Sequence, residues 1–278
     1  KNSVKVVLTG DGGDEILAGY PTHYVYKIAA LYKKIPAGLR ERFIKKIVEK
    51  LPVSTDRLSR DYVLKRFVQG AGYSFQEAHF LWKAIFYDHQ KEKLFTDRFK
   101  NLSTRNNSFS VCEDYFDRVK SEEVLNQLLY VDFKTFLLSN GLVRVDRMTM
   151  ANGIEARVPF LENNLVEFAS TIPCRYKIRG SITKYILRKL MKDKLPRGIT
   201  SMKKMGLLLP LSQLLAGKLK PFIEDTLAQK KIERTGLLNP GFVSQLLREH
   251  FEGRKDNSRQ IWNLAMFMVW FNKYTPVF

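Results

Sequence analysis

Hydrophobic residues follow two patterns along the chain, and the first is confined to its start. Residues 4–8 are short, β-branched and almost wholly apolar, and they run into the glycine-rich stretch 9–14. This pattern predicts a buried parallel strand followed by a tight turn. Beyond it the apolar positions recur at helical spacing, and no second convincing strand is predicted. The predicted helices cover residues 14–34, 37–50, 59–68, 74–88, 121–138, 142–154, 161–172, 182–194, 210–215, 219–229, 241–250 and 258–274.

A lone strand indicates that part of the fold lies elsewhere. Its backbone N–H and C=O groups need neighbouring strands, and we expect those strands to precede Lys1. The chain is then an excised piece of an α/β domain that is itself mostly α-helical. We expect residues 1–34 to hold the last strand and first helix of the α/β core, and residues 35–278 to form a helical part. The polar stretch 96–110 predicts a long loop.

Composition narrows the classes of protein. The 278 residues include 45% hydrophobic and 12% aromatic residues, enough for a globular core. No apolar run reaches the ~18 residues that a membrane span needs, and no signal-peptide pattern opens the chain. The two cysteines, Cys112 and Cys174, lie far apart. This argues against a disulfide framework or a zinc site and predicts a cytoplasmic protein.

The chain is strongly basic. Lys and Arg number 47 against 28 acidic residues, so the formal net charge is +19. Such a charge predicts attraction to polyanions such as ATP, pyrophosphate, nucleic acid or an anionic membrane surface, and the alternative is a basic solvated surface. The positive residues are scattered at helical spacings without a nucleic-acid-binding signature. We therefore expect neither a nucleic acid nor a membrane as the partner.

The loop after the strand carries the first candidate chemistry. Its glycines let backbone amides approach phosphate oxygens closely, and its two aspartates can hold Mg²⁺ or accept a proton. Open α/β sheets bind ligands at this end of a strand. The alternative is a structural turn in which Asp14 caps the following helix, and the local pattern favours neither. The residues concerned are Gly10, Asp11, Gly12, Gly13 and Asp14.

Four segments, in order, resemble the motifs of the asparagine synthetase family. Residues 6–20, VVLTGDGGDEILAGY, resemble the family's Leu-Ser-Gly-Glu/Asp-Gly-x-Asp-Glu-x-x-x-Gly-Tyr motif. Residues 143–151, VRVDRMTMA, resemble its Val-Lys/Arg-Val-Asp-Arg helix, and residues 154–161, IEARVPFL, its Glu-x-Arg-Val-Pro-Phe-Leu turn. Residues 177–188, KIRGSITKYILR, resemble its Lys-x-Arg-Gly segment with the following Lys-x-x-Leu-Arg/Lys. The resemblance spans about residues 4–215.

This resemblance implies a fold and a reaction. The fold is the adenine nucleotide alpha hydrolase-like, or ATP pyrophosphatase, α/β fold with a parallel sheet, and residues 1–34 then belong to its nucleotide-binding core. The reaction is that of a glutamine-dependent amidotransferase, a carbon–nitrogen ligase. MgATP adenylates a small carboxylate, expected to be the aspartate side chain, and ammonia from glutamine displaces AMP to give asparagine. ATP and Mg²⁺ are the implied cofactors.

The resemblance also assigns roles to residues. Lys184, expected in the first turn of its helix, is the catalytic cation that meets charge developing on the phosphates; its alternative is an ordinary exposed lysine. Asp14 holds the metal, and Asp11 supports the intermediate or accepts a proton from ammonia. Binding roles fall to Thr9, Gly10, Gly12 and Gly13 for the nucleotide and to Arg144 and Lys204 for the substrate.

Arg157 is expected to be structural. Glu155, two positions away, can form an ion pair with it that locks a buried turn before Pro159.

The chain departs from the family in two places. Ser139 and Asn140 stand where many bacterial relatives carry an acidic pair, which leaves the acceptor carboxylate open. Leu207 replaces an aromatic residue in the basic loop that contains Lys204.

Two pieces of the family pattern are missing. The Ser-Gly-Gly-x-Asp-Ser loop that wraps the ATP phosphates is absent, as is the amino-terminal glutaminase domain, and we expect both upstream of Lys1. Neither Cys112 nor Cys174 forms a recognisable pair with the scattered histidines, so no glutaminase activity is assigned to this chain.

Two other functions remain as alternatives. A sister amidotransferase would amidate a sugar acid or peptide-like metabolite or close a β-lactam ring, and the departure at Ser139 and Asn140 favours it. A non-catalytic basic helical binding module would use the +19 charge for a polyanionic partner. Retention of Asp11, Asp14 and Lys184 together argues against such a module. A homodimer is a candidate assembly.

Overall fold

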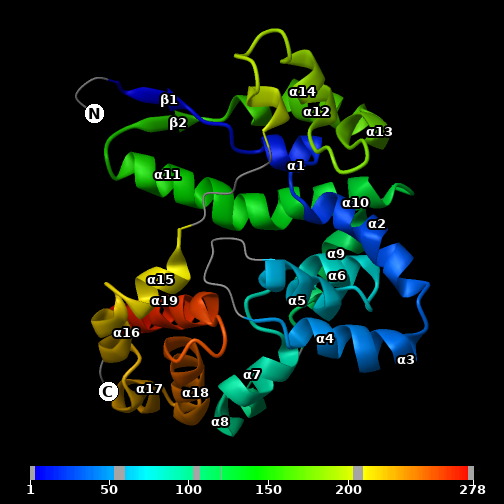
Figure 1. The fold of residues 1–278 in the computed structure, drawn as a ribbon. Coiled ribbons are helices and arrows are strands. Elements are labelled where there is room, and N and C mark those ends of the chain that lie inside the picture. Colours follow the sequence, from blue (N-terminus) through cyan, green and yellow to red (C-terminus); the bar gives the residue numbers. More distant parts are fainter. Residues whose placement is uncertain (1–3, 53–59, 103–106, 120, 203–208, 275–278) are drawn as a thin grey trace. The chain divides into compact units, whose positions relative to one another are not determined.

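The computed structural model describes residues 4–52, 60–102, 107–119, 121–202 and 209–274. The chain forms two compact units (Figure 1). Unit 1 comprises residues 1–34, 71–80 and 109–205, and unit 2 comprises residues 35–70, 81–108 and 206–278. Residues 35–278, which we expected to form one helical part, therefore contribute to both units.

Unit 1 combines a small sheet with short helices. Its elements are β1 (Val6–Leu8), α1 (Gly13–Leu17), α2 (Thr22–Lys33), α6 (Phe75–Leu81, whose last residue falls in unit 2), α9 (Ser110–Arg118), α10 (Val124–Asp132), the π-helical segment η2 (Phe133–Leu142), α11 (Val143–Met150), β2 (Glu155–Arg157), the 3₁₀ turn η3 (Pro159–Leu161), α12 (Asn163–Thr171), α13 (Cys174–Lys177), α14 (Tyr185–Leu190) and the 3₁₀ turn η4 (Ile199–Ser201).

β1 has a partner that the hydrophobic pattern did not reveal. β2 pairs with it in parallel, with Val6 opposite Glu155 and Leu8 opposite Arg157. The expectation of no second strand was therefore wrong. β2 has only three residues and charged side chains at both ends, which is too short for an alternating signal.

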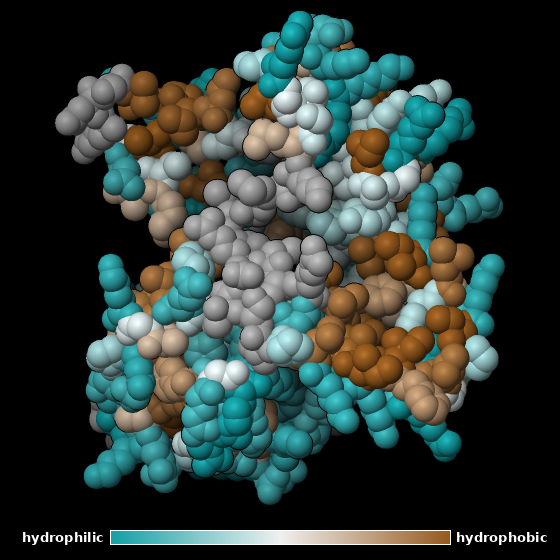
Figure 2. All heavy atoms as spheres, viewed as in Figure 1, coloured by the Kyte–Doolittle hydropathy of each residue, from teal (hydrophilic) through white to brown (hydrophobic). Residues whose placement is uncertain are grey.

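β1 was also expected to be buried, and this was wrong. Within the described residues the sheet has two strands, and Leu8 is 73% exposed. Figure 2 shows hydrophobic side chains gathered on the surface at the position of β1.

A long helical stretch underlies the sheet (Figure 1). α10, η2 and α11 follow one another without a break, although two separate helices were predicted. In the π-helical part the hydroxyls of Thr135 and Ser139 each donate to a carbonyl four residues earlier, at 2.6 Å. α11 packs against β2, and α10 packs against α1 and α2.

The helix predicted over residues 14–34 is two helices. Ala18 adopts a left-handed conformation with φ 60° and ends α1, and α2 begins at Thr22 after Pro21. The break sends the two helices to different neighbours, because Ile16 packs with α12 whereas Ala18 packs with α10.

Unit 2 is helical, and most of its described buried apolar residues form one core. Its helices are α3 (Ala37–Leu39), the π-helical η1 (Arg40–Ile44), α4 (Lys45–Glu49), α5 (Arg60–Gly70), α7 (Asp88–Leu94), α8 (Asp97–Leu102), α15 (Leu211–Ala216), α16 (Lys220–Thr226), α17 (Gln229–Thr235), α18 (Pro240–Phe251) and α19 (Ser258–Tyr274). α19 has the predicted bounds. The buried core is made of Phe86, Leu94, Leu215, Ile223, Leu227, Ile232, Leu238, Val243, Leu246, Ile261, Leu264, Ala265 and Met268.

The stretch 96–110, predicted as a long loop, contains α8 and the first residue of α9. Residues 103–106 lie outside the described part. Across the described ranges, no helix combines the length and apolar character needed to cross a membrane. The expectation of a mostly helical chain with one clear amino-terminal strand is confirmed.

Candidate active site

The glycine-rich loop joins β1 to α1 along a path that excludes larger residues. Gly12 caps α1 with φ 84°, a left-handed conformation that favours glycine. A Cβ at Gly12 would lie 2.2 Å from the Leu161 side chain, and one at Gly13 would lie 3.2 Å from Phe160. Asp14 lies in the first turn of α1 and is not the cap, so its carboxylate is not used to start the helix.

Asp14 and Lys184 come together although they are far apart in the sequence. The Lys184 Nζ lies 2.8 Å from Asp14 Oδ1, and both side chains are mostly buried. Gly19 makes this approach feasible, since a Cβ there would lie 1.7 Å from Asp14 Oδ1 and 2.5 Å from Lys184 Cε. The sequence showed Gly19 only as part of a motif, whereas the structure gives it a steric role at the pair.

Lys184 is positioned by an unusual backbone conformation. It is the N-cap of α14 with φ 51°, whereas we expected it in the first turn of a helix over residues 182–194. A left-handed conformation costs a non-glycine residue about 1–2 kcal/mol. The preceding turn, closed by reciprocal backbone hydrogen bonds between Arg179 and Ile182, carries Gly180 at φ 60°. The strained residue therefore follows a tight turn that directs its side chain to Asp14.

Thr9 and Gly10 could contact a ligand at the start of the loop. The Thr9 N–H donates to the Arg157 carbonyl at 2.9 Å and prolongs the β1–β2 pairing. Its hydroxyl oxygen is buried without a hydrogen-bond partner in the described part of the chain. A Cβ at Gly10 would meet nothing within 4 Å. A buried hydroxyl that lacks a partner, next to uncrowded backbone, fits a bound polar group such as a nucleotide.

The structure also places Arg144, Arg157 and Asp11, which the sequence nominated. Arg144 lies exposed on α11, and Lys204 lies outside the described residues. Arg157 forms the expected ion pair with Glu155, at 2.9 Å. The expectation of a buried turn was wrong, because both side chains are more than half exposed. Asp11 is half-buried in the loop.

Glu15 is a buried acid in the first turn of α1. It accepts a hydrogen bond of 2.6 Å from the Tyr20 hydroxyl. Burial raises the pKa of Glu15, and the nearby carboxylates of Asp14 and Asp132 raise it further. Glu15 therefore holds its proton to higher pH than an ordinary glutamate.

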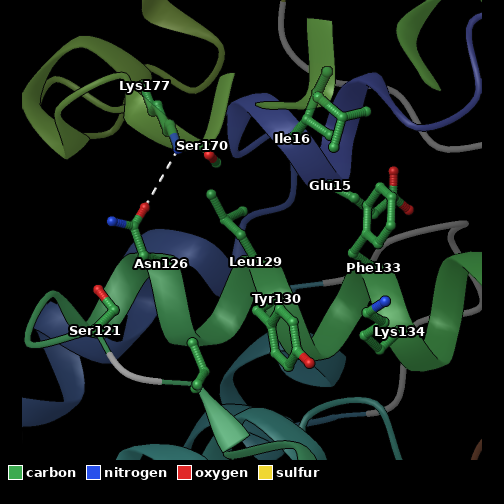
Figure 3. Close-up of a pocket in the computed structure, with 12 residues that line it drawn as sticks. Glu15, Ile16, Ser121, Asn126, Leu129, Tyr130, Phe133, Lys134, Ser170 and Lys177 are labelled. Atoms are coloured by element: carbon green, nitrogen blue, oxygen red, sulfur yellow. Dashed lines mark hydrogen bonds between the residues drawn. The ribbon is translucent and has the colours of Figure 1, made fainter. Parts of the chain in front are cut away.

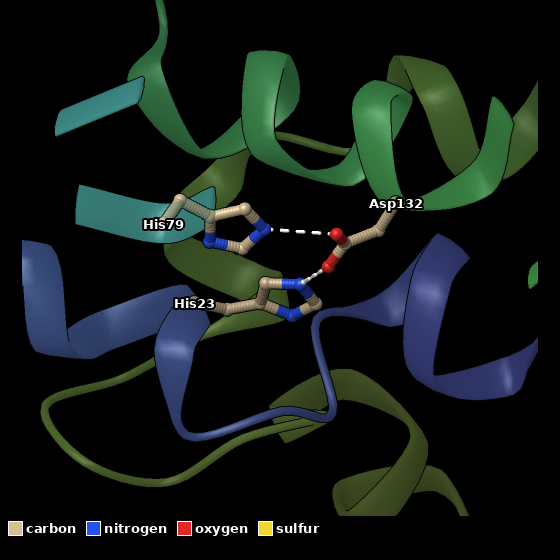
Figure 4. A group of neighbouring side chains, drawn as sticks. All are labelled: His23, His79 and Asp132. Carbon is tan, nitrogen blue, oxygen red and sulfur yellow. Dashed lines mark hydrogen bonds and ion pairs between the residues drawn. The ribbon is translucent and has the colours of Figure 1, made fainter. Parts of the chain in front are cut away.

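Two histidines and an aspartate form a buried cluster in unit 1 (Figure 4). Asp132 Oδ2 lies 2.8 Å from His23 Nε2, and Asp132 Oδ1 lies 2.8 Å from His79 Nε2. The ligand atoms of all three lie within 4.8 Å of one another, as a metal site would require. However, the Tyr20 N–H donates to His23 Nδ1 at 3.4 Å. Nε2 of His23 then carries the proton, which favours a hydrogen-bonded cluster over a metal site.

The sequence did not point to this cluster, because the histidines are scattered. One signal was available. Asp132 follows Val131 in a helix whose inner face is otherwise apolar, with Leu125, Leu128 and Leu129 buried. A carboxylate at the end of such a face needs buried donors.

A pocket of about 740 Å³ lies beside Gly19 and the Lys184 turn. Arg188 on its wall donates to three carbonyls, those of Thr183, Thr200 and Met202, at 2.6–2.9 Å. These bonds tie η4 to α14. The sequence showed Arg188 only as a motif position, and its structural role was not predicted.

Comparisons with known proteins identify the family of this chain. The sequence model of the asparagine synthase family matches residues 1–272. The chain is 30% identical over 271 residues to asparagine synthetase [glutamine-hydrolyzing] 1 of Bacillus subtilis, which covers 97% of this chain and 40% of that protein. It is 26% identical over 163 residues to asparagine synthetase [glutamine-hydrolyzing] of Gallus gallus, covering 51% of this chain and 27% of that protein. No solved structure matches the chain.

The chain spans about 40% of the length of the Bacillus subtilis relative. The family match extends over nearly the whole chain and includes the β1 loop, the long helix and the Lys184 turn. The chain therefore belongs to the asparagine synthase family.

Proposed function

We propose that this chain is the acceptor-side part of an ATP-dependent ligase that converts aspartate into asparagine with ammonia from glutamine. The observation that carries the proposal is the ion pair of Asp14 and Lys184, held over Gly19 at the end of a parallel strand. The Asp14 carboxylate can bind a metal ion, and Lys184 supplies a positive charge. A metal ion and a cation both stabilise the charge that develops on a departing phosphate group.

The loop residues fit MgATP. Asp14 would hold Mg²⁺, which neutralises phosphate charge, and Lys184 would bind phosphate oxygens. The unpartnered Thr9 hydroxyl and the backbone of Gly10, Gly12 and Gly13 would line the nucleotide. Arg144 and Lys204 would serve the substrate.

The reaction would proceed in two displacements. A side-chain carboxylate oxygen of aspartate attacks the α-phosphorus of ATP, and the bond to pyrophosphate breaks. Ammonia then attacks the activated carbonyl carbon, the bond to AMP breaks, and Asp11 accepts the proton that nitrogen loses. Lys184 stabilises the charge that builds on the departing phosphates. The ammonia would come from a glutaminase domain in the longer protein.

One observation favours a carboxylate substrate other than aspartate. Ser139 and Asn140, in place of an acidic pair, lie in η2, and both are exposed. A sister amidotransferase acting on another small carboxylate would keep the same phosphate chemistry and differ there.

The test is pyrophosphate release by the full-length protein with MgATP, glutamine and aspartate. We expect release to depend on aspartate and Lys184→Ala to lower kcat by at least ~10²-fold, through lost transition-state stabilisation. Lys194→Ala, which removes an exposed lysine beyond α14, is the matched control. Unchanged turnover in Lys184→Ala would refute the role of this lysine, and release that depends on another carboxylate would establish the sister activity.

A further inference from the structure

Lys177 is a buried lysine without an acidic partner in the described chain. It ends α13 and is 1% exposed. Its Nζ makes one hydrogen bond to a described residue, a 3.3 Å bond to the side-chain oxygen of Asn126 (Figure 3). Burial lowers the pKa of Lys177. An ammonium group has three N–H donors, so two of them lack an acceptor among the described residues.

The lysine lies on the wall of a pocket of about 450 Å³ within unit 1. The pocket lies between α10, α12 and α1, and its walls are mainly apolar, formed by Ile16, Leu129, Phe133 and Val166. Figure 3 shows Lys177 and Glu15 on different sides of the space. A volume of this size is sufficient for a small organic ligand.

We propose that this pocket binds a small monocarboxylate with an apolar body. A buried cation without a counter-charge is unfavourable, and a ligand carboxylate would supply both the charge and the missing acceptors. The apolar walls would cover the body of the ligand. Lys177 can pair with one carboxylate, and a second would face the acid Glu15 in place of a cation, so aspartate, with two carboxylates, is a poor fit.

This site is separate from the Asp14–Lys184 pair and does not depend on the proposed reaction. It shares one element with that pair, because Glu15 and Ile16 belong to α1, which also carries Asp14. A bound acid would therefore pack against the helix of the catalytic loop.

The experiment measures binding of benzoate and of its neutral analogue benzamide to the full-length protein by calorimetry. We expect benzoate to bind at least ~10-fold more tightly than benzamide, because only benzoate pairs with an ammonium. Lys177→Met should weaken benzoate binding by at least ~10-fold. Lys134→Met removes an exposed lysine from the same pocket and should change it less than about twofold.

A second variant guards against loss of folding in Lys177→Met. Ser170→Trp places a bulky group at the pocket from an exposed helix position and should abolish benzoate binding with Lys177 intact. The proposal is overturned by any of three results. These are no saturable benzoate binding below about 10 mM, wild-type affinity in either folded variant, or displacement of benzoate by equimolar aspartate.

Discussion

Unit 1 and unit 2 bury different kinds of side chain. Most of the described buried apolar residues of unit 2 form one cluster, and its buried polar groups are neutral or a histidine, namely Ser212, Thr226, His250, Asn257 and Ser258. Unit 1 has several small apolar clusters. It buries Glu15, Asp132 and Lys177, three side chains that are ordinarily charged.

The buried charged side chains of unit 1 lower its stability, whereas the buried apolar side chains of unit 2 raise its stability. A buried charge costs several kcal/mol unless it is paired, while an apolar core contributes to stability directly. Unit 2 therefore serves as a stable helical body. Unit 1 tolerates costly groups around α1, the helix of the proposed catalytic loop.

The largest expected effect on activity comes from Gly19→Ala, a substitution within unit 1. Its Cβ would lie 1.7 Å from Asp14 Oδ1, so the ion pair must open. We expect pyrophosphate release to fall by at least ~10²-fold, since a displacement of about 1 Å can cost that much. Gly38→Ala, where a Cβ meets nothing within 4 Å, should leave activity unchanged. Wild-type activity in Gly19→Ala would show that the pair is not needed.

The apolar core of unit 2 can be tested with Ile261→Ala. Ile261 is fully buried, and the cavity should lower the free energy of unfolding by about 2–5 kcal/mol. The three tryptophans, Trp82, Trp262 and Trp270, all lie in unit 2, so the fluorescence of this chain in urea reports on that unit.

Ile47→Ala is the control for the core, because Ile47 is 65% exposed on α4. A loss as large in Ile47→Ala as in Ile261→Ala would contradict the assignment of the core.

The buried cluster of unit 1 should respond to loss of one charge. In Asp132→Asn an amide NH₂ group replaces one carboxylate oxygen. This donor then faces the N–H of a histidine, so one hydrogen bond is lost. We expect unfolding free energy to fall by about 1–3 kcal/mol, seen as faster amide hydrogen exchange in α2 and α10. Asp114→Asn, at an exposed acid on α9, should not change exchange there. Equal protection in Asp132→Asn and wild type would mean that the cluster does not stabilise unit 1.

A smaller effect concerns pH in unit 2. Burial lowers the pKa of His250, with Asp256 opposing the shift. The unfolded chain then takes up a proton as pH falls below about 6.5 while the folded chain does not, so stability falls toward acid, by at most about 1.4 kcal/mol per pH unit. His250→Gln should flatten this slope in tryptophan-monitored unfolding. His89 is shifted in the same direction and should retain its own part of the slope. An unchanged slope would exclude His250 as its source.

The sequence pattern predicted the bounds of α19 but missed the short strand β2 and the break between α1 and α2. α19 has both predicted ends because its 17 residues carry a sustained apolar period. The sequence did not predict β2, because three residues are too few to show an alternating hydrophobic pattern. The break after Ala18 was missed although Pro21, which interrupts a helix, follows it in the sequence.

The same limit holds for the site. Motif resemblance nominated Asp14 and Lys184 separately, but their 2.8 Å contact depends on tertiary folding. The pairing of His23 with His79 through Asp132 joins three helices, and no local pattern encodes it. The assigned roles of the loop residues remain predictions.

The left-handed backbone of Lys184 has an evolutionary consequence. Glycine or asparagine would occupy that conformation with less strain, so the local backbone and the proposed chemistry favour different residues at one position. In a lineage released from selection for catalysis, we expect this codon to drift early toward Gly or Asn. The identity of this residue would then distinguish active paralogues from retired ones.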